Sequence, residues 1–443
     1  MSIRDQIIQR FIARTQKSQT LTERAKRVLP GGDTRSGVYY LPYPAYMVEG
    51  SGSRLTDIDG NVYFDLLANY TSLVHGHAHP QILAAAQAVL PSGGVFAAPM
   101  QKQVELAELI CARVPSVETM RFTTSGSEGT QMALRAARAY TGRSGVLKML
   151  GSYHGSHDLA SATADPDADR GIPEGLRCNI FYVPYNDLPA TDAMLTAHGH
   201  EIAALIVEPV PNAGGLPLAH AGYLQGLRDL CNKHDVLLVF DEVVTLRLHE
   251  GGYQAQTGVL PDLTAMGKII GGGFAVGAFG GKREIMQNFD PTRKNSIGHS
   301  GTFNGHSVTM AAGLESLKLL NQAEIDRINT LGERLGRGFD DAFAEAGIRG
   351  RTTYVGSLVQ VHWRTGDINN MGDVAAGFAQ AGDLPYLLHL ELMNRGVYSA
   401  ARGEYCTTTA MHEADIDRAI AIFSDTLHYL KPYVARVNEA LIA

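Results

Sequence analysis

A continuous apolar run that ends in acidic residues constrains the fold most strongly. Residues 236–243 read VLLVFDEV. A strand that is apolar at every position, rather than at every second one, is typical of a parallel sheet covered on both faces. Ligands of such sheets lie outside the carboxyl ends of the strands. Asp241 is therefore predicted at a ligand-binding edge. Residues 203–210, AALIVEPV, repeat the pattern and indicate an α/β fold.

A lysine in an apolar, glycine-rich setting follows this strand. Residues 261–281 read PDLTAMGKIIGGGFAVGAFGG, with Lys268 near the centre. A lysine held away from water is a nucleophilic amine, and it can form a Schiff base with an aldehyde cofactor such as pyridoxal phosphate. A loop lysine at a helix end before glycine is the competing interpretation. A P-loop is excluded, because Ile269 stands where that motif needs Ser or Thr.

Asp241 and Lys268 together are more specific than either residue alone. Pyridoxal phosphate needs a carboxylate against its pyridine nitrogen, because a protonated ring is the better electron sink. A strand-end aspartate can also simply cap the next helix. The two residues lie one short crossover apart in the sequence, which favours a shared cofactor site.

These two stretches resemble the class III aminotransferase family of fold-type I pyridoxal-phosphate enzymes. The resemblance extends from LPGG at residues 29–32 to the last helix. Its nearest branch contains glutamate-1-semialdehyde aminomutase and the β-amino-acid (β-phenylalanine type) aminotransferases. It implies a mostly parallel seven-stranded sheet in a large domain and a smaller α+β domain. The implied division is an N-terminal segment joining the small domain (1–60), the large domain (61–330) and the small domain (331–443).

A phosphate site is predicted where a short strand enters a helix. Residues 121–128 read RFTTSGSE, so Ser125, Gly126 and Ser127 lie at a helix N-terminus. Free backbone N–H groups and the positive end of the helix dipole make that position suitable for an anion. A capping serine without any ligand is the competing interpretation.

The resemblance implies roles for further residues around the cofactor. Lys268 would carry the cofactor and Asp241 would face its ring nitrogen. Tyr153 would stack on the ring, and Glu208 would lie near the ring hydroxyl and the pyridine side. Val243, at the end of the FDEV text, would contact the cofactor. Thr302, in a Gly-Thr pair, would cross a dimer interface to the phosphate of the partner's cofactor.

Two arginines are candidates for binding substrate carboxylates. Arg35 lies in the aromatic stretch DTRSGVYYLPYP (33–44), and Arg402 lies in YSAARGEY (398–405). Their planar guanidinium groups bind a carboxylate through two parallel hydrogen bonds. Tyr39 could pack the rest of the substrate. Surface or interface ion pairs remain the alternative for both arginines.

Composition excludes several other functional classes. A net charge of −7 gives no sign of nucleic-acid binding, and no apolar run is long enough to span a bilayer. The charged N-terminus lacks a secretory signal, and the four cysteines form no CxxC pair, so a cytoplasmic protein is expected. His75, His77 and His79 alternate as metal ligands can, but no Cys or carboxylate cluster accompanies them, and we predict no metal.

We therefore expect a homodimeric, pyridoxal-phosphate-dependent aminotransferase with shared active sites. It would move an amino group from a donor, with a β-amino acid favoured, to a 2-oxo acid such as 2-oxoglutarate or pyruvate by ping-pong kinetics. A Rossmann dehydrogenase is excluded, because no G-x-G-x-x-G follows a first strand. A glutamate-1-semialdehyde-type aminomutase is the alternative. Residues 244–248, VTLRL, depart from the G-F-R text of the aminomutases.

Overall fold

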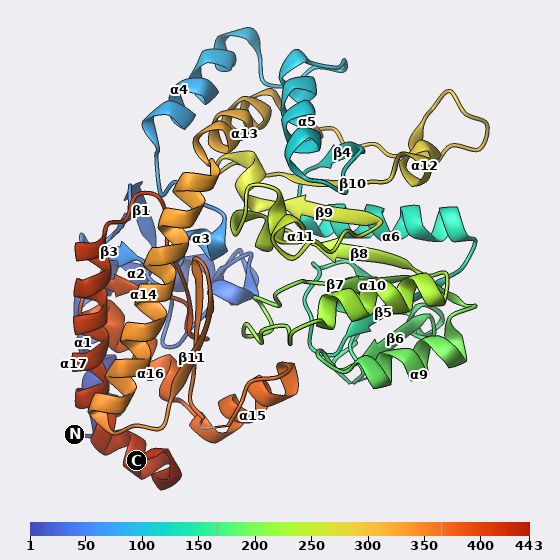
Figure 1. Ribbon diagram of the computed structural model, residues 1–443. Coiled ribbons are helices and arrows are strands. Elements are labelled where there is room, and N and C mark those ends of the chain that lie inside the picture. The colour runs from blue at the N-terminus through green and yellow to red at the C-terminus, as the bar shows by residue number, and fades with distance from the viewer. Residues whose placement is uncertain (166, 365) are drawn as a thin grey trace. The chain divides into compact units, whose positions relative to one another are not determined.

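The protein forms two compact units. The computed structural model describes residues 1–165, 167–364 and 366–443, and Figure 1 follows them along the chain by colour. Unit 1 comprises Met1–His79, Arg327–Asp367 and Val374–Ala443, and unit 2 comprises Pro80–Asp326 and Ile368–Asp373. The two ends of the chain thus belong to one unit and most of its middle to the other.

A seven-stranded sheet is the centre of unit 2. Its order is β4-β10-β9-β8-β7-β5-β6. Strands β5 to β9 pair in parallel, whereas β10 is antiparallel to both β9 and β4. This mostly parallel sheet confirms the predicted fold class. The strands are β4 (Thr119–Thr123), β5 (Gly145–Met149), β6 (Ile180–Val183), β7 (Ile202–Val207), β8 (Leu237–Asp241), β9 (Leu263–Gly267) and β10 (Gly277–Gly281).

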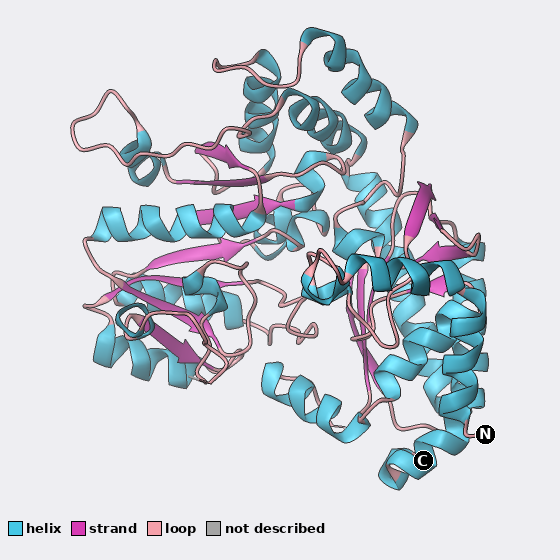
Figure 2. Cartoon of the chain, turned by 180° about the vertical axis from the view of Figure 1, so that it is seen from behind, coloured by secondary structure: helices cyan, strands magenta, loops and turns pink. Residues whose placement is uncertain are grey.

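Helices cover both faces of this sheet, which explains the unbroken apolar runs. Figures 1 and 2 show α6 (Gly126–Thr141) on one face, and α9 (Leu188–His198) and α10 (Tyr223–Lys233) on the opposite face. Side chains of each strand alternate between the faces. Those buried with α6 include Val146, Ala204, Ile206 and Val239. Those buried with α10 include Leu147, Leu205, Val207 and Phe240.

The remaining helices of unit 2 surround this core. They are α4 (Pro80–Val89), α5 (Gln101–Arg113), α7 (Asp158–Ser161), α8 (Glu174–Arg177), α11 (Gly252–Thr257), α12 (Arg283–Met286) and α13 (Ser307–Leu319). Two helices, α14 (Gln322–Ala346) and α15 (Met371–Ala381), begin in unit 2 and continue into unit 1. No helix in the described part of the chain is long and apolar enough to cross a membrane.

Unit 1 contains two small sheets and several helices. The sheets are β1-β2-β3-β13 and β11-β12-β14. The strands are β1 (Met47–Ser51), β2 (Arg54–Asp57), β3 (Val62–Asp65), β11 (Arg351–Val355), β12 (Leu358–His362), β13 (Val397–Tyr398) and β14 (Glu404–Cys406). The helices are α1 (Ile3–Arg14), α2 (Gln16–Ala25), α3 (Ala68–Thr71), α16 (Leu384–Asn394) and α17 (Glu413–Val437).

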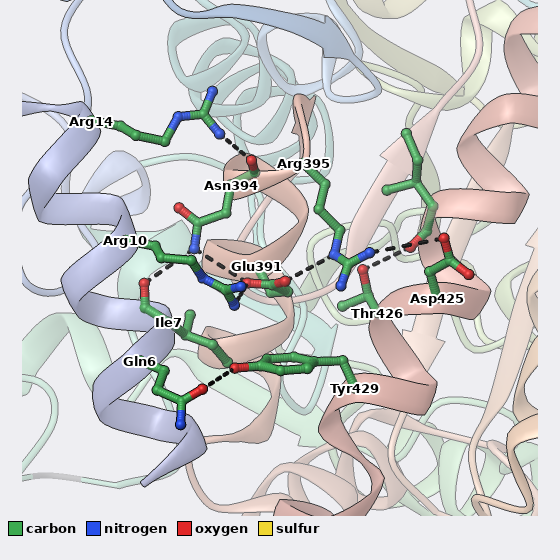
Figure 3. A network of polar contacts seen from close by, with 11 residues as sticks. Gln6, Ile7, Arg10, Arg14, Glu391, Asn394, Arg395, Asp425, Thr426 and Tyr429 are labelled. Carbon is green, nitrogen blue, oxygen red and sulfur yellow. Dashed lines mark hydrogen bonds and ion pairs between the residues drawn. The ribbon is translucent and has the colours of Figure 1, made fainter. Parts of the chain in front are cut away.

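A buried carboxylate fastens α1 to the C-terminal helices of unit 1. Glu391 on α16 has a side chain only 1% exposed and lies between Arg10 of α1, at 2.6 Å, and Arg395, at 2.8 Å (Figure 3). Tyr429 of α17 donates a hydrogen bond of 2.9 Å to Gln6. A buried charge is costly unless it is paired, so the two guanidinium groups make α1 an integral part of the unit.

The close approach of β10 to the loop before α6 predicts a sensitive position. A Cβ added at Gly277 would overlap the Ser125 carbonyl oxygen, which is backbone. We expect Gly277→Ala to lower the free energy of unfolding by about 1–3 kcal/mol, because the backbone must shift to admit the methyl group. Urea unfolding measures the loss. Gly175→Ala is the control, since no atom lies within 4 Å of its added Cβ. Equal stability of both variants would contradict the prediction.

Candidate active site

Asp241 ends β8 as a buried carboxylate with two hydrogen bonds. Its side chain is 6% exposed. Oδ2 lies 2.9 Å from His154 Nδ1, and Oδ1 accepts a bond of 3.1 Å from the Val243 backbone N–H. Burial lowers the pKa of His154, although the Asp241 carboxylate opposes that shift. A neutral His154 that donates from Nδ1 to Asp241 satisfies both observations.

Lys268 follows β9 directly and has a left-handed backbone. It opens the 3-10 turn Lys268–Gly271 with φ of +48°. Residues other than glycine rarely adopt such a φ, and they cluster at functional sites when they do. Gly267 before it lies close to Gly126, since an added Cβ would be 3.5 Å from the Gly126 Cα. Lys268 is thereby brought beside the N-terminus of α6.

The side chain of Val243 fills the space between the same segments. A Cβ added at Gly126 would lie 3.0 Å from Val243 Cγ2, and one added at Gly267 would lie 3.4 Å from Val243 Cγ1. The ends of β8 and β9 and the start of α6 therefore meet at one edge of the sheet. The segments that carry Asp241, Lys268 and the serine loop are brought together there.

Both serines at the N-terminus of α6 keep a hydrogen for a ligand. Ser125 Oγ accepts a bond of 3.2 Å from the Glu128 N–H, and Ser127 Oγ accepts one of 3.1 Å from the Ser156 N–H. A hydroxyl that accepts can still donate. Gly155 allows this close packing: its φ is +108°, and an added Cβ would be 2.5 Å from Ser127 Oγ. The helix start can thus offer hydroxyl and backbone donors to an anion.

Tyr153 and Glu208 lie on two loops that are tied together. The Tyr153 N–H donates a bond of 3.3 Å to Glu208 Oε2. Glu208 is buried directly after β7, whereas the Tyr153 residue is 53% exposed. An exposed ring on an anchored backbone is suited to stacking against a flat ligand. Thr302 is exposed in the loop before α13, and no hydrogen bond joins it to these residues within the described chain.

The two candidate substrate arginines lie in unit 1 and contact adjacent residues, Asn69 and Tyr70. Arg35 donates a bond of 2.9 Å to Asn69 Oδ1. The Arg402 guanidinium lies over the Tyr70 ring, 5.2 Å from its centroid. It also pairs with the buried Glu404, at 2.9 Å from its Nε. Tyr39, the third predicted residue of this group, is 46% exposed.

The short segment α3 is a left-handed turn rather than a regular helix, and it presents Asn69 and Tyr70 to these arginines. Ala68, Asn69, Tyr70 and Thr71 all have φ between +46° and +70°. Four consecutive L-residues in this region are strained, because Cβ crowds the carbonyl oxygen. The Tyr70 hydroxyl donates to the Gly37 carbonyl oxygen and ties the turn to the segment that follows Arg35. Sequence reasoning assigned no role to Asn69, Tyr70 or His154.

The histidine run does not form a metal site with its neighbours. His77 Nε2 lies 2.7 Å from Asp65 Oδ2, and His75 Nδ1 lies 3.0 Å from Thr409 Oγ1. Among the described residues, no group of three or more His, Cys, Asp and Glu side chains could hold a metal ion.

Comparisons with known proteins find relatives that match most of the chain. The family model described as aminotransferase class-III matches residues 37–397. A glutamate-1-semialdehyde 2,1-aminomutase from Methanothermobacter thermautotrophicus is 37% identical over 94% of this chain and 100% of its own. A β-phenylalanine transaminase from Variovorax paradoxus is 38% identical over 93% of each chain. The crystal structure of an omega-transaminase from Sphaerobacter thermophilus has a TM-score of 0.89 and 40% identity, covering 94% of this chain and 98% of its own.

The lowered pKa of His157, a partly buried histidine close to His154, predicts that the protein loses stability in acid. Burial, followed by the nearby His154 and Lys148, lowers the pKa of His157 to about 4 from 6.5. The folded state therefore binds fewer protons than the unfolded state between these values, and its stability falls as the pH drops below about 6.5. His157→Asn should remove up to about 1.4 kcal/mol per pH unit of this dependence.

Urea unfolding between pH 7 and pH 4 measures the slope. His200→Asn is the control, because the side chain of His200 is 76% exposed. The prediction fails if His157→Asn and the control show the same acid dependence as the parent protein.

Proposed function

We propose that this chain, which belongs to the class III aminotransferase family and is a pyridoxal-phosphate-dependent transaminase, transfers the amino group of a β-amino acid to a 2-oxo acid such as 2-oxoglutarate or pyruvate. The observation that carries this proposal is the convergence of Asp241, Lys268 and the N-terminus of α6 at one edge of the sheet. The similarity to a β-phenylalanine transaminase supports the donor class.

The residues at this edge match the chemical groups of the cofactor. An aldehyde needs an amine, which Lys268 supplies. A pyridine nitrogen needs a carboxylate, which Asp241 supplies, and a phosphate needs the donors of Ser125, Gly126 and Ser127. When bound, pyridoxal phosphate supplies an electron sink for the bond broken at the amine-bearing carbon of the substrate.

Each protein residue then has a defined task. Asp241 holds the ring nitrogen in its protonated form, and His154 keeps Asp241 oriented through the bond of 2.9 Å. The Lys268 amine takes the proton from the amine-bearing carbon of the donor and later returns a proton to the carbon of the acceptor. Tyr153 stacks on the ring, and Val243 packs from the side of Gly126 and Gly267. The donor leaves as an oxo acid before the acceptor binds at the same site, and this order gives ping-pong kinetics.

A second copy of the chain completes the proposed site. Thr302 is exposed and, as proposed, donates to the phosphate bound by the partner subunit. The neighbouring Phe303 is 58% exposed, and a cavity of about 990 Å³ beside it is lined by residues that include Gly301, Val104 and Gln103. An exposed aromatic ring next to a large hollow fits burial in a homodimer.

An aminomutase is the second candidate, supported by the 37% identity to a glutamate-1-semialdehyde 2,1-aminomutase. Such an enzyme moves nitrogen within one substrate and needs no separate acceptor. The VTLRL text at residues 244–248 favours the transaminase, and a single-turnover experiment separates the two.

A single turnover without acceptor tests the reaction class. A β-amino acid such as β-phenylalanine should release about one equivalent of oxo acid per subunit, because the enzyme keeps the nitrogen until an acceptor arrives. Lys268→Ala should retain the cofactor through the phosphate and ring contacts but release no oxo acid. Chromatography measures the oxo acid released by the parent protein and by Lys268→Ala. Turnover of glutamate-1-semialdehyde without any release of oxo product from amino acids would support the aminomutase instead.

Substitution of the two arginines should lower kcat/KM only for donors that carry a carboxylate. Arg35→Ala should lower kcat/KM for a β-amino acid, because about 2–4 kcal/mol of transition-state binding is lost with the paired hydrogen bonds. The value of kcat/KM for the matching amine without a carboxylate should change little. Arg402→Ala should show the same selectivity if its guanidinium binds substrate in addition to Glu404. Steady-state kinetics with the paired donors measure both effects. Equal losses for acid and amine would assign the arginine to the fold.

A further inference from the structure

A hollow lined by arginines lies in unit 2, at the C-terminal end of α6. Its volume is about 720 Å³. Arg135 and Arg138 of α6 line it, together with Arg143, which follows the end of the helix. The other walls come from residues 175–179 and 295–298. No Asp or Glu side chain is among the described residues that line it, although the chain as a whole carries a net charge of −7.

Arg138 is the unusual member of this group. Its Nε is buried and has no hydrogen-bond partner among the described residues. Burial lowers the pKa of Arg138, and no carboxylate offsets that shift. A guanidinium has five N–H donors in a planar fork. Buried donors are normally paired, so the unpaired Nε–H of Arg138 beside a hollow points to an acceptor that comes from outside the chain.

The neighbouring arginines differ in how far they are engaged. Arg135 makes one bond of 3.5 Å, to the Gly298 carbonyl oxygen, and no ion pair within the described chain. Arg143 is held by Asp235, at 2.7 Å, and by the Gly199 carbonyl oxygen, at 3.2 Å. Arg135 and Arg138 therefore keep donors for a ligand, and Arg143 adds a fixed positive charge.

The helix end explains only part of this arrangement. The negative end of a helix dipole favours cations in the last turn, and Arg138 lies there. The dipole does not, however, accept hydrogen bonds from a guanidinium. The backbone carbonyl of Arg138 already accepts from the N–H of Gly142. The buried Nε–H of the side chain remains unpaired after the dipole is taken into account.

We propose that this arginine hollow binds a small polyanion that carries two or more phosphate or carboxylate groups. Forked guanidinium groups bind both kinds of oxyanion through paired hydrogen bonds. The volume is that of a small-molecule site, and the net negative charge of the chain disfavours nucleic acid. The hollow lies toward the other end of α6 from Ser125, with Arg135 and Arg138 roughly 15–20 Å from Ser125 along the helix axis. It is therefore separate from the proposed cofactor phosphate site.

Isothermal titration of the cofactor-loaded protein tests this site. Inorganic pyrophosphate and citrate are titrated separately in chloride buffer, so the two probes distinguish a phosphate ligand from a polycarboxylate. At least one probe should bind with a stoichiometry of one per subunit, and this binding should depend on the arginines that line the hollow. Arg135→Gln/Arg138→Gln should weaken that binding at least tenfold, while cofactor content and melting temperature stay unchanged.

Arg349→Gln is the matched control. Arg349 is exposed in unit 1 and, like Arg135, makes one bond of 3.5 Å to a backbone carbonyl oxygen. The variant removes one positive charge away from the hollow, where the double variant removes two, and it should bind the probe as the parent protein does. The proposal is overturned if neither probe binds, if the double variant binds as tightly as the parent, or if the control loses affinity to the same extent.

Discussion

The proposed chemistry depends on holding one carboxylate in place at a buried sheet edge. Asp241 is nearly inaccessible, yet two donors approach it: the ring of His154 and the Val243 N–H. These two hydrogen bonds fix the orientation of the carboxylate. A neutral histidine does so without adding a full positive charge next to the place where a protonated ring nitrogen would bind.

Close backbone approach brings the rest of the site to this carboxylate. Gly126 and Gly267 let Val243 settle between the start of α6 and the end of β9, and Gly155 lets a loop rest on Ser127. Side chains at these positions would separate groups that must act on one ligand. The packing of the large sheet and the geometry of the site are therefore one constraint, since the same strands that form the core end at the reacting groups.

Much of this was predictable from the sequence, and the failures have a physical cause. Unbroken apolar runs identified β7 and β8, because a strand that is buried on both faces has no alternating polar positions. The serine-rich helix start and the stop at Gly142 identified α6, which ends there with φ of +71° at its cap. The residues that sequence reasoning missed act through contacts between distant segments. His154 follows Tyr153 directly, but its partner lies 87 positions away. The left-handed turn at residues 68–71 has no periodic signature.

The buried Glu391 on α16 has a consequence for chains that begin late. Arg10 supplies one of the two positive charges that compensate it, and Arg10 lies before the second methionine, Met47. A polypeptide started at Met47, or trimmed by a protease beyond α1, would retain the whole of unit 2 but leave that carboxylate short of a cation in an apolar setting. The N-terminal helix thus supplies a charge to a carboxylate that lies 381 positions later in the sequence.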